Sequence, residues 1–193
     1  NNDWVPITPR LATNDAGSGL WDLPRMTADT ISESGGRRQI MYCPGSKATV
    51  QDIDNWWEFN DKYRVTTYQW LFERFKPGSA DYSAAGDKPT HRKDALPYAT
   101  KLSVAATNTS VSASELVTDV VISEGPGGLT DKFTGVYTSN PQIIPNGYNS
   151  SHMSTATRPG GGNILFQDNH AEWRNFNKMK IYVDWSNSRH WWW

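Results

Sequence analysis

The clearest alternation of hydrophobic and polar positions lies at residues 163–174, near the end of the chain. Two short apolar runs flank the polar sequence Gln167-Asp168-Asn169-His170. Asp and Asn both tolerate positive φ, which a two-residue type I′ turn demands at its central positions. The pattern therefore predicts a β-hairpin whose turn is Asp168-Asn169. The predicted facing pairs are Gln167 with His170, Phe166 with Ala171, and Leu165 with Glu172.

Two earlier segments have the signals of short helices. Residues 27–36 predict one, with Thr27 as its N-cap and Gly35 or Gly36 closing it in the left-handed conformation. Residues 50–60 carry large apolar side chains at spacings of three and four, which predicts one or two helical turns.

Other apolar, β-branched or aromatic runs predict strands, because such side chains suit a pleated and partly buried surface. The predicted strands are residues 38–42, 64–72, 117–122 and 180–185. The predicted loops, rich in Pro, Gly and Asn, are residues 1–24, 76–94 and 129–151. The chain has no internal repeat, which argues against a solenoid or propeller.

Composition narrows the class of protein. The 193 residues fit one domain or a tightly fused pair. Only 37% of the residues are hydrophobic and the mean hydropathy is -0.67, yet ten Trp, eight Tyr and six Phe supply large apolar surfaces. A disordered chain lacks such surfaces, so we expect an aromatic core beneath polar loops.

Charge excludes two classes of partner. The net charge is -1, and the pair Arg37-Arg38 is too small to form the basic patch that nucleic-acid binding requires. No basic amphipathic segment for a membrane surface is present. The sequence also holds no run of about 18 apolar residues.

The single cysteine, Cys43, excludes an intrachain disulfide and a zinc cage made of cysteines. No histidine lies near it in the sequence, as a nucleophilic cysteine would require. We therefore interpret Cys43 as a small buried residue.

Adjacent tryptophans raise a packing question, because neighbouring side chains in a helix or strand point in different directions. Trp56-Trp57 and Trp191-Trp192-Trp193 therefore cannot all face one core. Three destinations remain open: the chain's own N-terminal segment, a protein interface, or a ligand such as a sugar. The candidate interface or ligand aromatics are Trp56, Trp57, Trp191 and Trp192.

The predicted hairpin belongs to a longer motif. After His152 the chain reads Pro159-Gly160-Gly161-Gly162-Asn163-Ile164-Leu165-Phe166-Gln167-Asp168-Asn169-His170-Ala171-Glu172-Trp173. This resembles the H…GGN-x-L-F-x-D-G-H-x-x-W ending of the prepilin-type (H-x9-DG) family, pilin-like and type II secretion pseudopilin proteins abundant in Planctomycetes, Verrucomicrobia and Lentisphaerae. Here more than nine residues separate His152 from Asp168, and Asn169 stands where the family has Gly.

Two more pieces of the resemblance follow in order. Ile40-Met41-Tyr42-Cys43-Pro44-Gly45 is similar to the family's hydrophobic-x-C-P-S/G step. Asp119-Val120-Val121-Ile122-Ser123-Glu124 is similar to the strand before its Ser/Asn-His element, here Ser150-Ser151-His152. The pieces together span residues 38–175.

The resemblance implies a single α+β domain over residues 1–193: a pilin-like head with an antiparallel sheet, short helices, long loops and a C-terminal β-hairpin. It implies a non-enzymatic subunit of the bacterial cell envelope, periplasmic or at the cell surface, in a type II secretion or type IV pilus-type assembly. Its partners would be other pilin-like subunits or further copies of itself. The family's N-terminal hydrophobic helix, which would anchor the native protein in the membrane, is missing from this sequence. The alternative is a secreted carbohydrate-binding module that uses exposed Trp side chains.

Candidate metal ligands are few. His152, Asp168 and His170 are competent ligand types, and the competing interpretation is that Asp168 shapes the turn while His152 bonds to backbone across the core. Calcium is an open alternative, because pseudopilins of type II secretion hold it in a late loop. Oxygen-rich stretches occur at Asp131 and residues 140–149, but neither has EF-hand spacing. We expect no cofactor otherwise.

Overall fold

The computed structural model describes residues 20–59, 61, 63–71, 110–136, 147–185 and 189–193. In these residues it combines two α-helices with nine strands in antiparallel sheets, which confirms the α+β class. No helix in the described ranges has the length and apolar character needed to cross a membrane. Residues 76–94, residues 140–146 and most of 1–24 lie outside the description.

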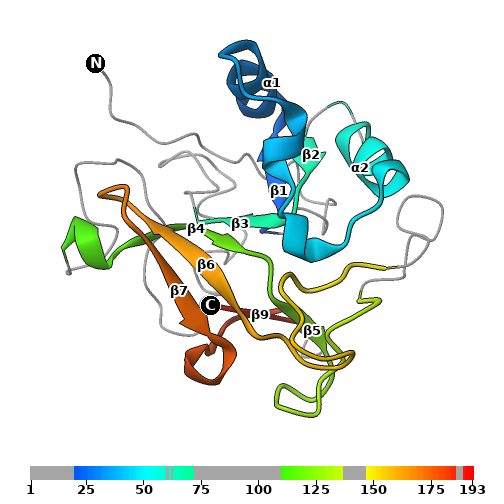
Figure 1. Ribbon diagram of the computed structural model, residues 1–193, viewed down its shortest axis with the longest axis vertical. Helices are drawn as coiled ribbons and strands as arrows, with labels where there is room; N and C mark the ends of the chain where they lie inside the picture. Colours follow the sequence, from blue (N-terminus) through cyan, green and yellow to red (C-terminus); the bar gives the residue numbers. More distant parts are fainter. Residues whose placement is uncertain (1–19, 60, 62, 72–109, 137–146, 186–188) are drawn as a thin grey trace, which may run out of the picture.

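One end of the molecule is built from helices and a two-stranded sheet (Figure 1). Strand β1 (Asp22–Pro24) pairs with β2 (Tyr63–Val65), and the helices α1 (Arg25–Glu33) and α2 (Val50–Trp57) stand beside them. Helix α2 confirms the prediction for residues 50–60. It begins with a capping box, in which Thr49 and Asp52 satisfy each other's backbone N–H groups.

Helix α1 differs from its prediction at one end. It begins directly after Pro24, so Thr27 lies inside the helix and is not its N-cap. Pro24 is the N-cap residue, with a ψ of 134° that is not helical, and no side chain caps the first turn. At the other end, Gly35 has a φ of 96°, the left-handed conformation predicted for a residue that closes the helix.

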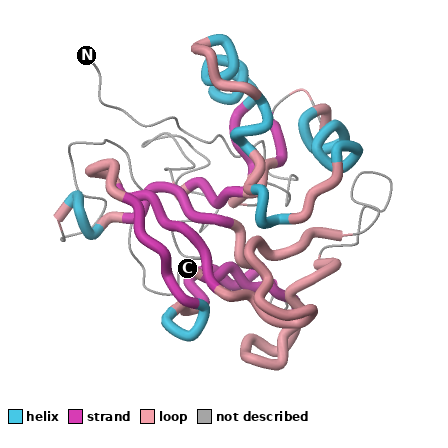
Figure 2. Tube along the Cα trace, viewed as in Figure 1, coloured by secondary structure: helices cyan, strands magenta, loops and turns pink. Residues whose placement is uncertain are grey.

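The rest of the described chain forms two larger antiparallel sheets (Figure 2). The four-stranded sheet has the order β3 (Tyr68–Trp70), β4 (Glu115–Asp119), β6 (Gly161–Phe166), β7 (Ala171–Asn175). The three-stranded sheet has the order β5 (Ile122–Glu124), β9 (Arg189–Trp192), β8 (Ile181–Trp185). Short 3₁₀ turns are η1 (Arg38–Met41), η2 (Pro44–Ser46), η4 (Val111–Ala113) and η5 (Phe176–Lys178).

Two predicted strands are each divided by a change of sheet. The segment predicted at 117–122 stops at Asp119, passes through Val120 and Val121, and restarts as β5. The two valines are fully buried, one in each of the two hydrophobic clusters. Likewise 64–72 divides into β2 and β3 at the buried pair Thr66-Thr67. Apolar periodicity does not mark these breaks, because the chain stays buried through both.

The strand predicted at residues 38–42 is wrong. These residues form η1 and then lead into Cys43, with Met41 and Tyr42 buried and Ile40 exposed. Within η1 only Met41 is buried, and Tyr42 and Cys43 directly after it are buried as well, so the weak alternation in the sequence does not correspond to a buried and an exposed face. Residues 180–185, by contrast, form β8 as predicted.

The C-terminal hairpin forms between β6 and β7, but its turn differs from the prediction. Asn169 N–H donates to the Phe166 carbonyl, and Phe166 N–H donates to the His170 carbonyl. The loop therefore has three residues, and only Asn169 has positive φ, at 68°. The register moves by one residue, so Leu165 faces Ala171 and Ile164 faces Glu172.

The tryptophan question is resolved by two cores on either side of β9. Trp191 and Trp193 are buried in the main cluster, and Trp192 is buried in a second one with Phe133 and Phe176. Neighbouring rings do point to opposite sides, as expected.

The other adjacent pair is also internal. Trp56 stacks between Tyr42 and Tyr148, and the guanidinium of Arg64 lies over the Trp57 ring. All four candidate aromatics are therefore core residues, which among the three open destinations favours packing within the chain over a ligand or a partner.

Candidate functional site

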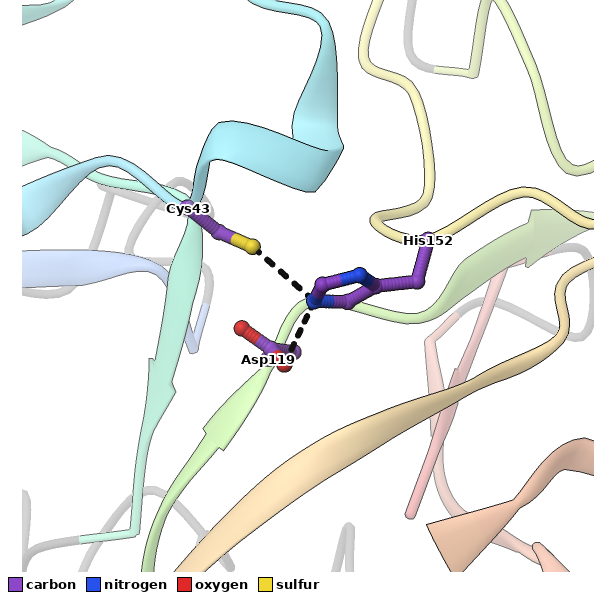
Figure 3. Close-up of side chains that lie close together, drawn as sticks. All are labelled: Cys43, Asp119 and His152. Atoms are coloured by element: carbon purple, nitrogen blue, oxygen red, sulfur yellow. Dashed lines mark hydrogen bonds and ion pairs between the residues drawn. The ribbon is translucent and has the colours of Figure 1, made fainter. Parts of the chain in front are cut away.

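Three side chains from distant parts of the sequence point at one another (Figure 3). The His152 Nε2 atom lies 3.1 Å from Cys43 Sγ and 3.0 Å from Asp119 Oδ2. Cys43 is 109 residues before His152, and Asp119 is 33 residues before it. In the described part of the chain this is the one group of three or more His, Cys, Asp or Glu side chains able to share a metal ion. We call it the Cys–Asp–His cluster.

Cys43 is held between two 3₁₀ turns. Its N–H donates to the hydroxyl of Thr67, which lies in the buried link between β2 and β3. The thiol is buried, and burial raises its pKa to about 11, with the negative charge of Asp119 adding to the effect. Cys43 is therefore a protonated thiol at neutral pH.

His152 has a fixed backbone. Its φ is 52°, which is uncommon for a residue with a side chain. Its N–H donates to the Gly45 carbonyl at 2.9 Å, and its own carbonyl accepts from Gly160 N–H at 2.8 Å. The Trp173 ring meets the imidazole edge-on, with centroids 5.1 Å apart. The imidazole is thereby presented to Cys43 in one orientation.

The glycine opposite His152 has a steric role. A Cβ on Gly45 would lie 2.5 Å from His152 Nδ1, closer than real Cβ atoms approach other atoms. The Cys43-Pro44-Gly45 step thus supplies the thiol and, two residues later, the space for its histidine partner.

Asp119 ends strand β4 with its carboxylate buried. Its Oδ2 atom accepts from the backbone N–H of Asn163 at 2.7 Å and from the Asn163 side-chain amide at 2.8 Å. Asn163 belongs to β6, the neighbouring strand. The pairing of β4 with β6 therefore aims the carboxylate at His152.

The arrangement fits metal coordination better than nucleophilic catalysis. In a catalytic triad, the carboxylate binds one imidazole nitrogen and the nucleophile binds the other. Here a single nitrogen, Nε2, faces both Cys43 and Asp119. Reactive cysteines also have lowered pKa values, whereas the pKa of Cys43 is raised. Three donor atoms within 4.8 Å of one another are close enough to serve as one ligand set.

The predicted metal candidates do not form a single site. His152 joins Cys43 and Asp119, whereas Asp168 and His170 pair with each other at the exposed hairpin tip. Asp168 accepts from His170 N–H at 3.2 Å, which confirms that Asp168 shapes the turn. The side chain of His152 bonds to other side chains, so the expectation of a bond to backbone is wrong for its imidazole.

The calcium candidates use their oxygens within the chain. Asp131 accepts from the Ser123 hydroxyl at 2.6 Å and from Gly127 and Gly128 N–H at 3.0 and 2.8 Å. Asn149 Oδ1 accepts from Gly135 N–H. The rest of the oxygen-rich stretch, residues 140–146, lies outside the described residues.

Cys43 and Asp119 were not predicted as site residues. The signal that could have found them is the resemblance itself, since its three pieces supply all the residues at this point. The contributing residues are Cys43, Asp119, His152 and Asn163. Three pieces recognised only as an ordered series thus meet in space.

Comparison with known proteins adds no relative. No family model matches this chain, and neither the curated proteins nor the solved structures contain a match.

Proposed function

We propose that this chain is a non-enzymatic, pilin-like subunit of the bacterial cell envelope that acts through protein–protein contacts. It would belong to a type II secretion or type IV pilus-type assembly, with its head in the periplasm or at the cell surface and an N-terminal helix as its membrane anchor. One observation supports this above all: the three pieces of the prepilin-type resemblance converge on the Cys–Asp–His cluster. These pieces contact one another through hydrogen bonds and close packing. Kinship with the family explains such contacts better than a separate chance similarity of each piece.

The geometry also favours a structural role for the cluster over a catalytic one. Its cysteine is buried and protonated, and its carboxylate already accepts three hydrogen bonds. Such a cluster joins η2, β4 and β6. A rigid head with a fixed surface is what a repeating assembly requires, because each subunit must present the same contacts.

Exposed apolar side chains indicate where such contacts would form. Met26 in α1 is 83% exposed, and Val50 at the start of α2 is 74% exposed. Both lie on the helical end of the molecule (Figure 1). Exposed apolar side chains contribute to association when a partner buries them.

Photo-crosslinking in the native organism tests the proposal. A photoreactive amino acid would replace Met26 or Val50, and, as a matched exposed control, Thr157 in a polar loop. We expect Met26 and Val50 to crosslink to further copies of this chain or to proteins with prepilin leaders, and Thr157 to give weaker products.

The gene provides a second, independent test. We expect codons for a short basic leader, a prepilin cleavage site and about 20 apolar residues ahead of Asn1, the length of a membrane-spanning helix. An ordinary cleavable signal peptide at that place, together with no crosslink at either helical position, would overturn the proposal.

A further inference from the structure

We propose that Cys43, Asp119 and His152 bind one divalent transition-metal ion of the zinc class, which joins three segments of the fold. The proposal goes beyond the envelope role, because the site would exist whatever the chain assembles with. It rests on the identity of the three donors, their spacing, their combined charge and the contacts that orient them.

The donor set selects the class of metal. A thiolate and an imidazole are preferred by zinc and its neighbours, whereas calcium and magnesium take oxygen ligands. One Cys, one His and one carboxylate are three donors that zinc uses in proteins.

The spacing of the donors is close to that of a tetrahedral site. With ordinary zinc–ligand bond lengths, a tetrahedral ion would separate sulfur from nitrogen by about 3.5 Å and nitrogen from oxygen by about 3.3 Å. The distances here are 3.1 and 3.0 Å, and all three donor atoms lie within 4.8 Å of one another. Small outward movements of the side chains would therefore admit the ion.

The charges of the site balance when a divalent ion is bound. A buried thiolate beside a buried carboxylate would bring two negative charges together without compensation. A divalent cation makes the set of thiolate, carboxylate and neutral imidazole electrically neutral. On binding, the S–H bond of Cys43 is replaced by a sulfur–metal bond and its proton passes to water, while the imidazole proton on Nε2 moves by way of water to Nδ1, so that Nε2 can bind the metal.

The surroundings hold the donors in place, as outer-shell groups do in metalloproteins. Asn163 donates twice to Asp119, and the backbone of His152 is fixed by Gly45 and Gly160. The His152 side chain is 28% exposed, whereas that of Asp119 is 2% exposed. The ion would therefore enter from the side of His152 and Asn163, and water would complete its coordination.

The test is metal binding by the whole chain, prepared without a polyhistidine tag. The protein would be stripped with a chelator, loaded with zinc, freed of excess ion and analysed for metal content. We expect one zinc per chain in the wild type and in His170→Gln, a matched control that removes a histidine from the hairpin tip. We expect Cys43→Ser and His152→Gln to retain far less zinc. Their affinity for zinc should fall by more than the about 10- to 100-fold that is typical when an outer-shell residue is removed.

Cobalt substitution separates ligation from a general folding defect. The wild type loaded with cobalt should show a thiolate-to-cobalt charge-transfer band, and Cys43 is the only thiol in the chain. Asn163→Ala keeps all three donors, so it should retain the band and bind more weakly by about tenfold.

Two outcomes would overturn the proposal. One is a wild type that retains far less than one zinc per chain and whose melting temperature zinc does not raise. The other is a Cys43→Ser variant that binds as much zinc as the wild type. In either case the three side chains form a hydrogen-bonded cluster only, and the envelope role would remain to be judged by crosslinking.

Discussion

Two of the Asp–His pairs in the described residues share their chemistry but differ in sequence separation, burial and partners. Asp168 and His170 are two residues apart, lie at an exposed hairpin tip and bond mainly to each other. Asp119 and His152 are 33 residues apart, lie beside a buried thiol and share partners from three further segments. The local pair shapes one turn, whereas the distant pair depends on the whole fold. The same substitution should therefore cost much more stability at the distant pair than at the local one.

The largest difference should come from removing each carboxylate. Asp119→Ala leaves the amide and N–H of Asn163 and the imidazole of His152 without their acceptor. The carboxylate that is lost is a buried, charged acceptor, and losing the hydrogen bonds to it costs about 3 kcal/mol of the free energy of unfolding. Urea unfolding with chelator present, so that no metal contributes, would measure this change.

Asp168→Ala is the control for that prediction. It removes an exposed carboxylate, and we expect no resolved change in the urea midpoint. Equal losses in the two variants would contradict the contrast between the pairs.

The second prediction concerns the space that admits His152. Gly45→Ala would place a methyl group against the imidazole of His152. The ring cannot easily move away, because hydrogen bonds hold both the N–H and the carbonyl of His152. Overpacking of this kind costs about 2 kcal/mol. We expect lower thermal stability and, if metal binds, weaker binding, because the imidazole must turn away from Cys43.

Gly128→Ala provides the comparison for Gly45→Ala. A Cβ at Gly128 would have no atom within 4 Å, and its backbone conformation is open to other residues. Its melting temperature should stay at or above that of the wild type. If Gly45→Ala behaved in the same way, the close approach of Gly45 and His152 would not be needed for the fold.

The same division between local and distant determinants explains what the sequence predicted. Helix α2, strand β8 and the existence of the β6–β7 hairpin follow from periodicity and turn residues, which act over a few positions. The hairpin register was predicted one residue off. Asp168 and Asn169 suit either a type I′ turn or a three-residue loop, and the stacking of Phe166 on His170 accompanies the latter.

The Cys–Asp–His cluster was beyond such signals. Nothing near Cys43 in the sequence indicates that β4 and β6 will be neighbours, or that the loop before β6 will pass next to η2. The interpretation of Cys43 as a small buried residue is confirmed, but it did not include the contact of Cys43 with His152. The change of sheet after Asp119 was missed for the same reason, since strand order comes from contacts between distant segments.

A smaller effect should separate turn geometry from side-chain bonding at the hairpin tip. Asn169 has positive φ, which glycine adopts freely and a β-branched residue resists. We expect Asn169→Val to lower the free energy of unfolding by about 1 kcal/mol and Asn169→Gly to leave it nearly unchanged. Equal losses would mean that the Asn169 side chain matters more than its backbone conformation.

The smallest effect is a titration at the same tip. A hydrogen bond from the His170 side chain is the main cause that lowers the pKa of Asp168 below its ordinary value, and the His170 N–H adds to it. A lowered pKa in the folded state means that the pair stabilises the protein above the ordinary Asp pKa and loses this contribution as the pH falls through the lowered value. Because Asp168 is exposed, solvent screens the pair, and the effect on stability should be slight.

Carboxyl-carbon chemical shifts followed by NMR should place the pKa of Asp168 below that of an unperturbed Asp, and His170→Gln should raise it. If that substitution left the pKa of Asp168 unchanged, the local pair would be a geometric neighbour only, and the contrast with the buried pair would be sharper still.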